Sequence, residues 1–145
     1  MIGGPLRGVP RRCAGWTELA GCPLHTDDDF PRSVQQFEDI MAKTPELDAF
    51  IPTGGFPPFI PDANRAAVEK YKDRIASKAL APVVADTLPV QIDQMKEGLS
   101  LGQVGQRTFE MGYMAVKAGK PAPADPIYTG LDVCTPETVD TCIAK

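Results

Sequence analysis

The chain has 145 residues, 43% of them hydrophobic, so it can bury roughly two thirds of its unfolded surface and form one domain around one core. Its 19 acidic residues outnumber the 15 basic ones and no basic run exceeds Arg11 and Arg12, so it lacks the electrostatic footprint of a nucleic-acid-binding protein. The apolar stretches, such as 79–85, are far shorter than the ~20 residues that cross a bilayer, so we expect a soluble protein.

From His25 onward, short apolar runs alternate with amphipathic segments of helical length, the pattern of βα units that build a parallel sheet. A first strand is predicted at 23–26, and the acidic turn 27–29 can cap the helix that follows it. That helix has one apolar face and ends before Pro45. The face consists of Val34, Phe37, Ile40 and Met41.

A second strand at 48–52 leads into 53–61, where glycines and prolines exclude a regular helix and favour a shaped, functional loop. The next helix is predicted over 62–75, with small residues that indicate close packing on a sheet. Its apolar stripe consists of Ala63, Ala67, Tyr71 and Ile75, with Val68 beside it.

Two more strands and two more helices continue the alternation: strand 81–85, a short helix from Pro89 to Gly98, strand 101–105, and a helix opened by Gln106 and ended at 119–121. The short helix is predicted to bury Ile92 and Met95. The last helix has a one-sided apolar stripe with the spacing of core residues. This stripe consists of Phe109, Gly112, Tyr113 and Val116.

The pattern as a whole predicts an α/β fold of three layers, with a mostly parallel sheet and flanking helices. Residues 127–133 are predicted to return as an extended segment, and the capping hydroxyl of Thr135 with Pro136 begins a carboxy-terminal helix. Before Trp16, glycines, prolines and arginines give no periodic apolar face, so 1–15 is predicted to be irregular and poorly ordered.

Candidate binding residues follow directly after the apolar runs, because ligands of open α/β sheets bind outside the carboxyl ends of the strands. They lie in 26–29, 53–59 and 86–88, and at Gln106 and Arg107.

The Asp, Gln and Arg side chains among these candidates can bond sugar hydroxyls, while Trp16, Phe56 or Phe59 can lie against the apolar face of a sugar ring. Structural roles compete with this interpretation. Asp86 can cap the next helix, and Gln106 can form hydrogen bonds with backbone groups at the end of a strand. Trp16 can cover an otherwise exposed edge of the fold.

The sequence offers no support for covalent catalysis, because it has no Gly-x-Ser-x-Gly motif and no phosphate-binding loop. We therefore expect no enzyme, no cofactor and no metal site. One rival is a magnesium-dependent receiver-like domain, in which Asp27, Asp28 and Asp86 would hold the ion. The order of elements argues against it, since Thr53 and Gln106 stand where a receiver has its phosphorylated Asp and its Lys.

The cysteines are Cys13, Cys22, Cys134 and Cys142, and they lack metal-type C-x-x-C spacing. They permit two disulfides with three connectivities, which suit an oxidising compartment, or free thiols in a cytosolic one. If 134–142 is largely helical, its ends lie about 12 Å apart, too far for a direct bridge. Residues 1–16 lack the apolar run of a secretory signal, so the chain as written is expected to be cytoplasmic.

Several segments together resemble the second half of type I periplasmic sugar-binding proteins, the ribose-binding-like components of ABC transporters. These segments are 47–53 (LDAFIPT), 82–89 (PVVADTLP), 96–98 (KEG), 104–106 (VGQ) and 109–113 (FEMGY). The resemblance implies an incomplete lobe of a protein that binds a monosaccharide and delivers it to an ABC transporter permease. It implies a periplasmic location and ligand contacts from the loop Thr53, Gly54 to Phe56, from Asp86 and from Gln106.

The resemblance also divides the chain. It assigns 16–106 to the core of the carboxy-terminal lobe, 107–126 to a helix and linker that belong to the other lobe, and 127–145 to a returning strand and helix. Gly54 stands where the family has Asn, which removes one hydrogen bond to the sugar. The family's amino-terminal lobe has no counterpart, so we expect a truncated and weakly binding form.

A non-binding association module stays open as the alternative. In either case the exposed face of the 107–118 helix lacks a lobe to pack on, which predicts a homodimer through that face. Sugar-responsive repressors share this core, but they carry an amino-terminal helix-turn-helix that this chain lacks, so transport is favoured over gene regulation.

Overall fold

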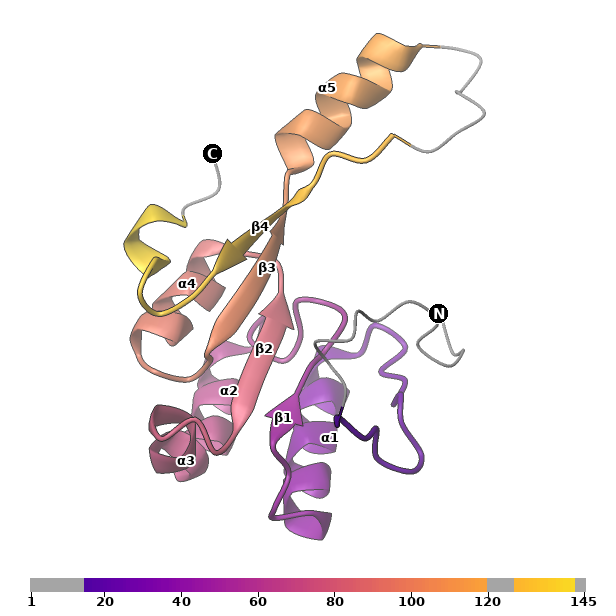
Figure 1. Cartoon of the computed structure of the whole chain (residues 1–145). Coiled ribbons are helices and arrows are strands. Elements are labelled where there is room, and N and C mark those ends of the chain that lie inside the picture. Colours follow the sequence, from indigo (N-terminus) through magenta and orange to yellow (C-terminus); the bar gives the residue numbers. More distant parts are fainter. Residues whose placement is uncertain (1–14, 120–126, 143–145) are drawn as a thin grey trace.

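The computed structural model describes residues 15–119 and 127–142 (Figure 1). The elements in chain order are α1 (Phe30–Lys43), β1 (Ala49–Phe50), α2 (Pro61–Val68), the 3-10 turn η2 (Glu69–Tyr71), α3 (Lys72–Ala76), β2 (Ala81–Ala85), α4 (Pro89–Lys96), β3 (Gly102–Gln106), α5 (Thr108–Ala118), β4 (Leu131–Cys134) and the 3-10 turn η3 (Val139–Thr141). The predicted alternation of strands and helices is thereby confirmed from α1 onward. The predicted disorder of 1–14, the linker 120–126 and Cys13 lie outside the described residues.

The four strands form one open sheet in the order β1-β2-β3-β4 (Figure 1). β1 pairs with β2 and β2 with β3 in parallel, whereas β4 returns antiparallel to β3. The β1 pairing is short and ends where Phe50 lies opposite Pro82. The mixed, mostly parallel sheet with flanking helices is the predicted α/β class, and it matches an incomplete type I lobe.

One face of the sheet carries the helical layer. The pairing register places Phe50, Pro82, Val84, Gln103 and Cys134 on this face, because paired residues point to the same side and every second residue of a strand does so too. Side chains of α1, α2 and α4 pack against it. On the other face Val133 is 69% exposed. Only one of the two helical layers of a three-layer lobe therefore comes from the described part of the chain.

The main core lies between this sheet face and the helices. Its buried apolar residues are Val34, Phe37, Met41, Ala67, Val68, Ile75, Leu80 and Leu99. The Phe37 ring contacts the rings of Phe50 and Tyr71 edge-on, with centroids 5.0 and 5.8 Å away. A second, smaller cluster joins Ile92 and Met95 of α4 to Cys134 and Val139, as predicted for the two α4 residues.

Local capping explains where the helices begin. The Asp29 carboxylate accepts the backbone N–H of Arg32 at 3.0 Å, so it caps α1 as the acidic turn predicts. Pro61 and Pro89 occupy the first turns of α2 and α4, where a missing N–H costs no intrahelical bond. The helix predicted over 62–75 is interrupted by η2, and its predicted stripe residue Ala63 is exposed while Asn64 is buried.

Two predicted elements are wrong. Residues 23–26 form no strand, because this segment runs against α1, where the side-chain amide of Gln36 donates to the His25 carbonyl at 2.9 Å. The carboxy-terminal helix is only the 3-10 turn η3, which follows a turn closed by the Thr138 N–H and the Thr135 carbonyl.

The same turn corrects the expectation for the cysteines. It brings the Cα atoms of Cys134 and Cys142 to 5.8 Å, and the two residues form a disulfide. Helical geometry would have kept them apart, so the bridge depends on the chain reversing after β4. Cys22 is a free thiol whose pKa is raised by partial burial and by the nearby Glu18.

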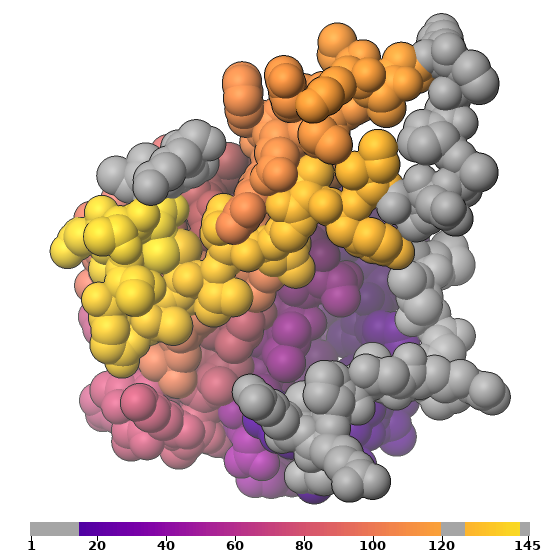
Figure 2. Space-filling view, turned by 45° about the horizontal axis from the view of Figure 1, so that its top comes forward, coloured from indigo at the N-terminus to yellow at the C-terminus, as the bar shows by residue number. Residues whose placement is uncertain are grey.

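The apolar stripe of α5 has the spacing of core residues, but its face is exposed in the described structure, as expected for a helix that has no lobe to pack on. Phe109 is 78% exposed and Tyr113 is 55% exposed, and no residue of α5 is buried. The helix and the segment that returns to β4 project from one end of the molecule (Figure 1, Figure 2). The apolar periodicity is present, but no other described element packs on it.

Two equivalent substitutions test this division between core and projecting helix. Phe37→Ala should lower the free energy of unfolding by about 3–5 kcal/mol, because it leaves a cavity between α1 and the sheet. Phe109→Ala should change the free energy of unfolding of the monomer, measured at a protein concentration too low for association, by no more than about 0.5 kcal/mol, since the ring is mostly in solvent. Urea denaturation followed by circular dichroism measures both, and equal losses would contradict the packing described.

Candidate functional site

The candidate binding edge is the end of the sheet where β1, β2 and β3 finish, toward α5 (Figure 1). Because these strands are parallel, three segments that are far apart in the sequence emerge at this one edge. The segments are the loop 53–59 after β1, residues 86–88 after β2, and Gln106 with Arg107 at the end of β3.

Asp86 and Gln106 meet at the binding edge. The side-chain amide of Gln106 donates to Asp86 Oδ1 at 2.9 Å, and the Asp86 N–H donates to the Val104 carbonyl at 2.8 Å. The bond between the side chains is exposed, so both groups keep polar atoms that solvent or a ligand can reach. The residue that precedes α4 at its N-cap is Leu88, so Asp86 does not cap that helix.

The backbone of Asp86 is in the left-handed region, with φ 72°. Asp and Asn enter this region more readily than other residues with a Cβ, because their short polar side chains bond locally. The conformation turns the chain sharply after β2 and keeps the carboxylate beside Gln106 at the end of β3. The pair thus joins the ends of two neighbouring strands.

Arg107 is engaged by acidic neighbours. Its Nε and Nη2 atoms donate to Asp132 Oδ1 at 3.1 and 2.9 Å, and Glu110 lies 3.6 Å from Nη1. The hydrogen bond to Asp132 raises the pKa of Arg107 above its ordinary value. The guanidinium therefore ties the start of α5 to β4, and its charge is already matched by two carboxylates.

The loop 53–59 is built around aromatic rings. Phe56 lies 4.7 Å from the ring of Phe30 and 5.8 Å from that of Phe59, measured between centroids. A Cβ on Gly54 would lie 2.8 Å from the Phe56 ring, and one on Gly55 would collide with Phe59. Both glycines are therefore required by the close approach of the rings.

The other two candidates are less constrained. Thr53 is exposed at the start of the loop, and Trp16 is 62% exposed in the segment before α1. The contacts that the structure shows at the binding edge thus bring Asp86 and Gln106 together, place Phe56 in an aromatic cluster, and direct Arg107 to Asp132.

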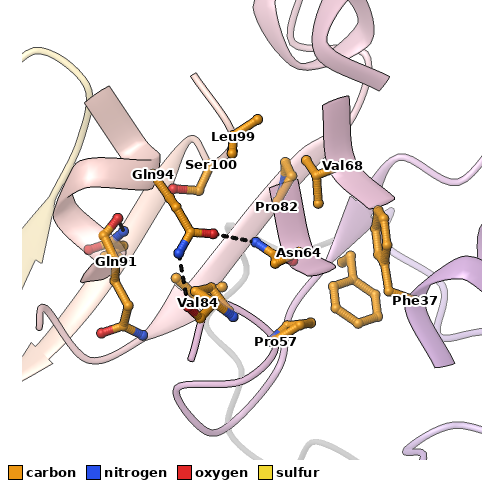
Figure 3. A pocket seen from close by; sticks show the side chains of 13 residues that line it. Phe37, Pro57, Asn64, Val68, Pro82, Val84, Gln91, Gln94, Leu99 and Ser100 are labelled. Atoms are coloured by element: carbon orange, nitrogen blue, oxygen red, sulfur yellow. Dashed lines mark hydrogen bonds between the residues drawn. The ribbon is translucent and has the colours of Figure 1, made fainter. Parts of the chain in front are cut away.

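Sequence reasoning missed the buried carboxamides of α4, Gln91 and Gln94 (Figure 3). They line a cavity of about 20 Å³, roughly the room of one water molecule. Its other lining residues include Phe37, Val84 and Ser100, so it lies between the helices and the sheet and not at Asp86. A glutamine in the first turn of a helix is the one local signal that could have drawn notice.

The acidic residues at the two turns do not gather. Arg32 binds Asp27 at 2.7 Å, and Asp27, Asp28 and Asp86 do not form a cluster able to share a metal ion; the described ranges contain no such group of three His, Cys, Asp or Glu. The geometry that the receiver-like alternative requires is therefore not found. None of the helices in the described ranges is long and apolar enough to span a membrane.

The left-handed backbone at position 86 gives a stability prediction. Glycine adopts this conformation freely, whereas alanine is strained in it and has no polar side chain to compensate. Asp86→Gly should therefore be more stable than Asp86→Ala by about 1 kcal/mol. Urea denaturation of the two variants measures the difference, and an alanine variant as stable as the glycine variant would contradict the described backbone.

No protein-family model matches the chain, and no curated protein matches it significantly. Among solved structures, it is similar to a solute-binding protein of an ABC transporter from Burkholderia graminis, in complex with D-arabinose: 26% identity, 83% of this chain and 42% of that chain covered, TM-score 0.65.

GanP, a glucose-galactose binding protein from Geobacillus stearothermophilus, is 25% identical over 78% of this chain and 40% of its own, with a TM-score of 0.62. A periplasmic ribose ABC transporter protein from Conexibacter woesei shares the fold at 15% identity, with a TM-score of 0.57. By their names, these three neighbours bind sugars or belong to ABC transporters. The chain spans about 40% of the length of the solved proteins that it matches. It is therefore similar in fold to one part of the sugar-binding proteins of ABC transporters.

Proposed function

We propose that this chain is a sugar-binding lobe of an ABC transporter substrate-binding protein, and that Asp86 and Gln106 bond the sugar. The observation that carries the proposal is their meeting at 2.9 Å across the ends of β2 and β3. Together they offer carboxylate and amide oxygens as acceptors and amide protons as donors, which suits vicinal sugar hydroxyls. Arg107 contributes by fixing the start of α5, and Thr53, Gly54 and Phe56 form the neighbouring wall.

A site of this kind is only half of an enclosing pocket. The solved neighbours are more than twice as long as the matched portion of their chains, so partners from a second lobe belong to a complete site. A ligand that stays half in water gains less from each hydrogen bond, and we expect dissociation constants on the order of millimolar. In this proposal 16–106 and 127–145 form the lobe, and 107–126 is a helix and linker that belong to the other lobe.

The compartment follows from the same proposal. A disulfide between Cys134 and Cys142 is the kind of bond that forms and persists in oxidising compartments, and it supports a periplasmic location. Delivery to an ABC transporter permease is then the role of the whole protein, to which this lobe contributes part of the ligand site. No catalytic step is needed for it.

Isothermal titration tests the sugar site directly. D-arabinose, D-ribose, D-galactose and D-glucose are titrated into the chain, and saturable heat is expected with at least one of them. Asp86→Ala and Gln106→Ala should each weaken binding about tenfold or more, because each leaves the partner and the sugar hydroxyl without a bond.

The chain offers a matched control. On α1, Gln35 donates to Asp39 Oδ1 at 3.0 Å in an exposed pair of the same chemistry away from the binding edge. Gln35→Ala and Asp39→Ala should leave sugar affinity unchanged. Absence of heat with every sugar, or equal losses in the control pair, would refute the assignment of the site.

The projecting helix favours a second candidate function, association through α5. Val116 is 84% exposed and Phe109 is 78% exposed. An isolated helix of this length is marginal in water, so a partner surface stabilises it. In a two-fold antiparallel pair centred between Gly112 and Tyr113, Phe109 lies opposite Val116 and each Tyr113 opposite the Gly112 of a second copy. We propose that this self-complementary face forms a homodimer.

The oligomeric state tests this proposal. Light scattering coupled to size exclusion at tens of micromolar should give the mass of a dimer, and Tyr113→Lys should give the monomer because it places a charge in the paired face. Tyr128→Lys is the control, since Tyr128 is also exposed but lies outside α5. A monomeric wild-type chain would refute the dimer. A dimer without sugar binding would favour the pure association module.

A further inference from the structure

Gln91 in α4 has a polar side chain with no exposed surface. Both its amide nitrogen and its amide oxygen are hydrogen-bonded to backbone groups. Its Nε2 donates to the Ala85 carbonyl at 2.7 Å and to the Gly55 carbonyl at 3.2 Å. Its Oε1 accepts the N–H of Leu88 at 2.9 Å. A single buried amide thus bonds three backbone groups, two just before its own helix and one, the Gly55 carbonyl, 36 residues away in the sequence.

Two of these groups belong to the two loops of the candidate binding edge. Gly55 lies in the loop 53–59, and Ala85 is the last residue of β2, directly before Asp86. The backbone pairing of β1 with β2 ends at Phe50 and Pro82, so it does not hold the loops together beyond that point. The side chain of Gln91 spans this gap.

The neighbouring glutamine of the same helix makes a different set of bonds. Gln94 is 2% exposed, and its Nε2 donates to the Pro58 carbonyl at 2.8 Å and to the Val90 carbonyl at 3.0 Å. Its Oε1 accepts from Asn64 at 2.7 Å, as the dashed line in Figure 3 shows. Gln94 therefore supports the far end of the first loop and α2, but it does not reach the segment at Asp86.

From this difference we infer that Gln91 is a positioning residue of the sugar site: it sets the distance between the loop at Gly54 and Phe56 and the carboxylate of Asp86 without touching the ligand. The inference rests on the proposed sugar-binding function. Its physical basis is the unfavourable free energy of a buried carbonyl that loses its hydrogen bond, which opposes any separation of the loops while Gln91 is present. The two sides of the half-site are thereby preorganised.

The test compares Gln91→Met with Gln94→Met, which remove the same amide at two buried positions of one helix. Nuclear magnetic resonance of the sugar-free chain is the first readout, because it does not depend on the proposed function. Gln91→Met should shift the backbone amides of Phe56 and Asp86 and the side-chain amide of Gln106. Gln94→Met should shift signals near Pro58 and Asn64 and leave Asp86 and Gln106 in place.

Sugar affinity is the second readout. Gln91→Met should weaken sugar binding about tenfold, although it changes no residue that contacts the sugar in the proposal. Gln94→Met should leave the affinity within about threefold of the wild-type value. Equal effects of the two substitutions on affinity, or unchanged signals at Asp86 and Gln106 in Gln91→Met, would overturn the positioning role. If the wild type binds no sugar, the proposed function fails, and the shifts alone still decide whether Gln91 couples the two loops.

Gln91→Asn serves if the methionine variant does not fold. Its amide remains polar but is one methylene shorter, so it cannot reach both Gly55 and Ala85. It should reproduce the shifts at Phe56 and Asp86, and a spectrum identical to that of the wild type would contradict the inference.

Discussion

The parallel pairing of β1, β2 and β3 is the constraint on which the rest of the structure depends. Because the strands run in one direction, a crossover must connect β1 to β2 and β2 to β3, and α2 to α3 and α4 supply these connections on one sheet face. The loops that follow β1, β2 and β3 therefore emerge together, at the carboxyl ends of the strands. Asp86 and Gln106 are 20 residues apart in sequence, yet their side chains bond for this reason.

Burial of carboxamides is the second determinant of the binding edge. Gln91, Gln94 and Gln103 are nearly or wholly inaccessible to water, which is unfavourable unless their amides are bonded. Here their NH2 groups donate to backbone carbonyls, as when Gln103 Nε2 donates to the Gln91 carbonyl at 2.7 Å, whereas Gln103 Oε1 has no partner in the described structure. An apolar side chain would fill the space between sheet and helices, but it would not fix the loops. The polar layer therefore links packing to the geometry of the proposed site.

Local chemistry allowed much of this to be predicted, and long-range contacts explain the remainder. Asp29 and Pro89 mark helix starts by their own capping and backbone properties, so α1 and α4 were predicted correctly. The apolar run 23–26 has strand-like composition but lies against α1, which composition does not reveal. The periodicity of Phe109 and Tyr113 indicates a buried face, but not which surface covers it. Gln91 stands in the first turn of α4, but its role depends on two backbone carbonyls from other elements, which that local position does not reveal.

We propose that Asp86 and Gln106, held at the ends of β2 and β3, form half of a sugar site. A titration of the ¹⁵N-labelled chain with D-arabinose, followed residue by residue in nuclear magnetic resonance spectra, tests this proposal. We predict saturable shifts that concentrate at Gly54, Asp86 and the side-chain amide of Gln106. Shifts that gather elsewhere on the chain, or none at all at high sugar concentration, would contradict it.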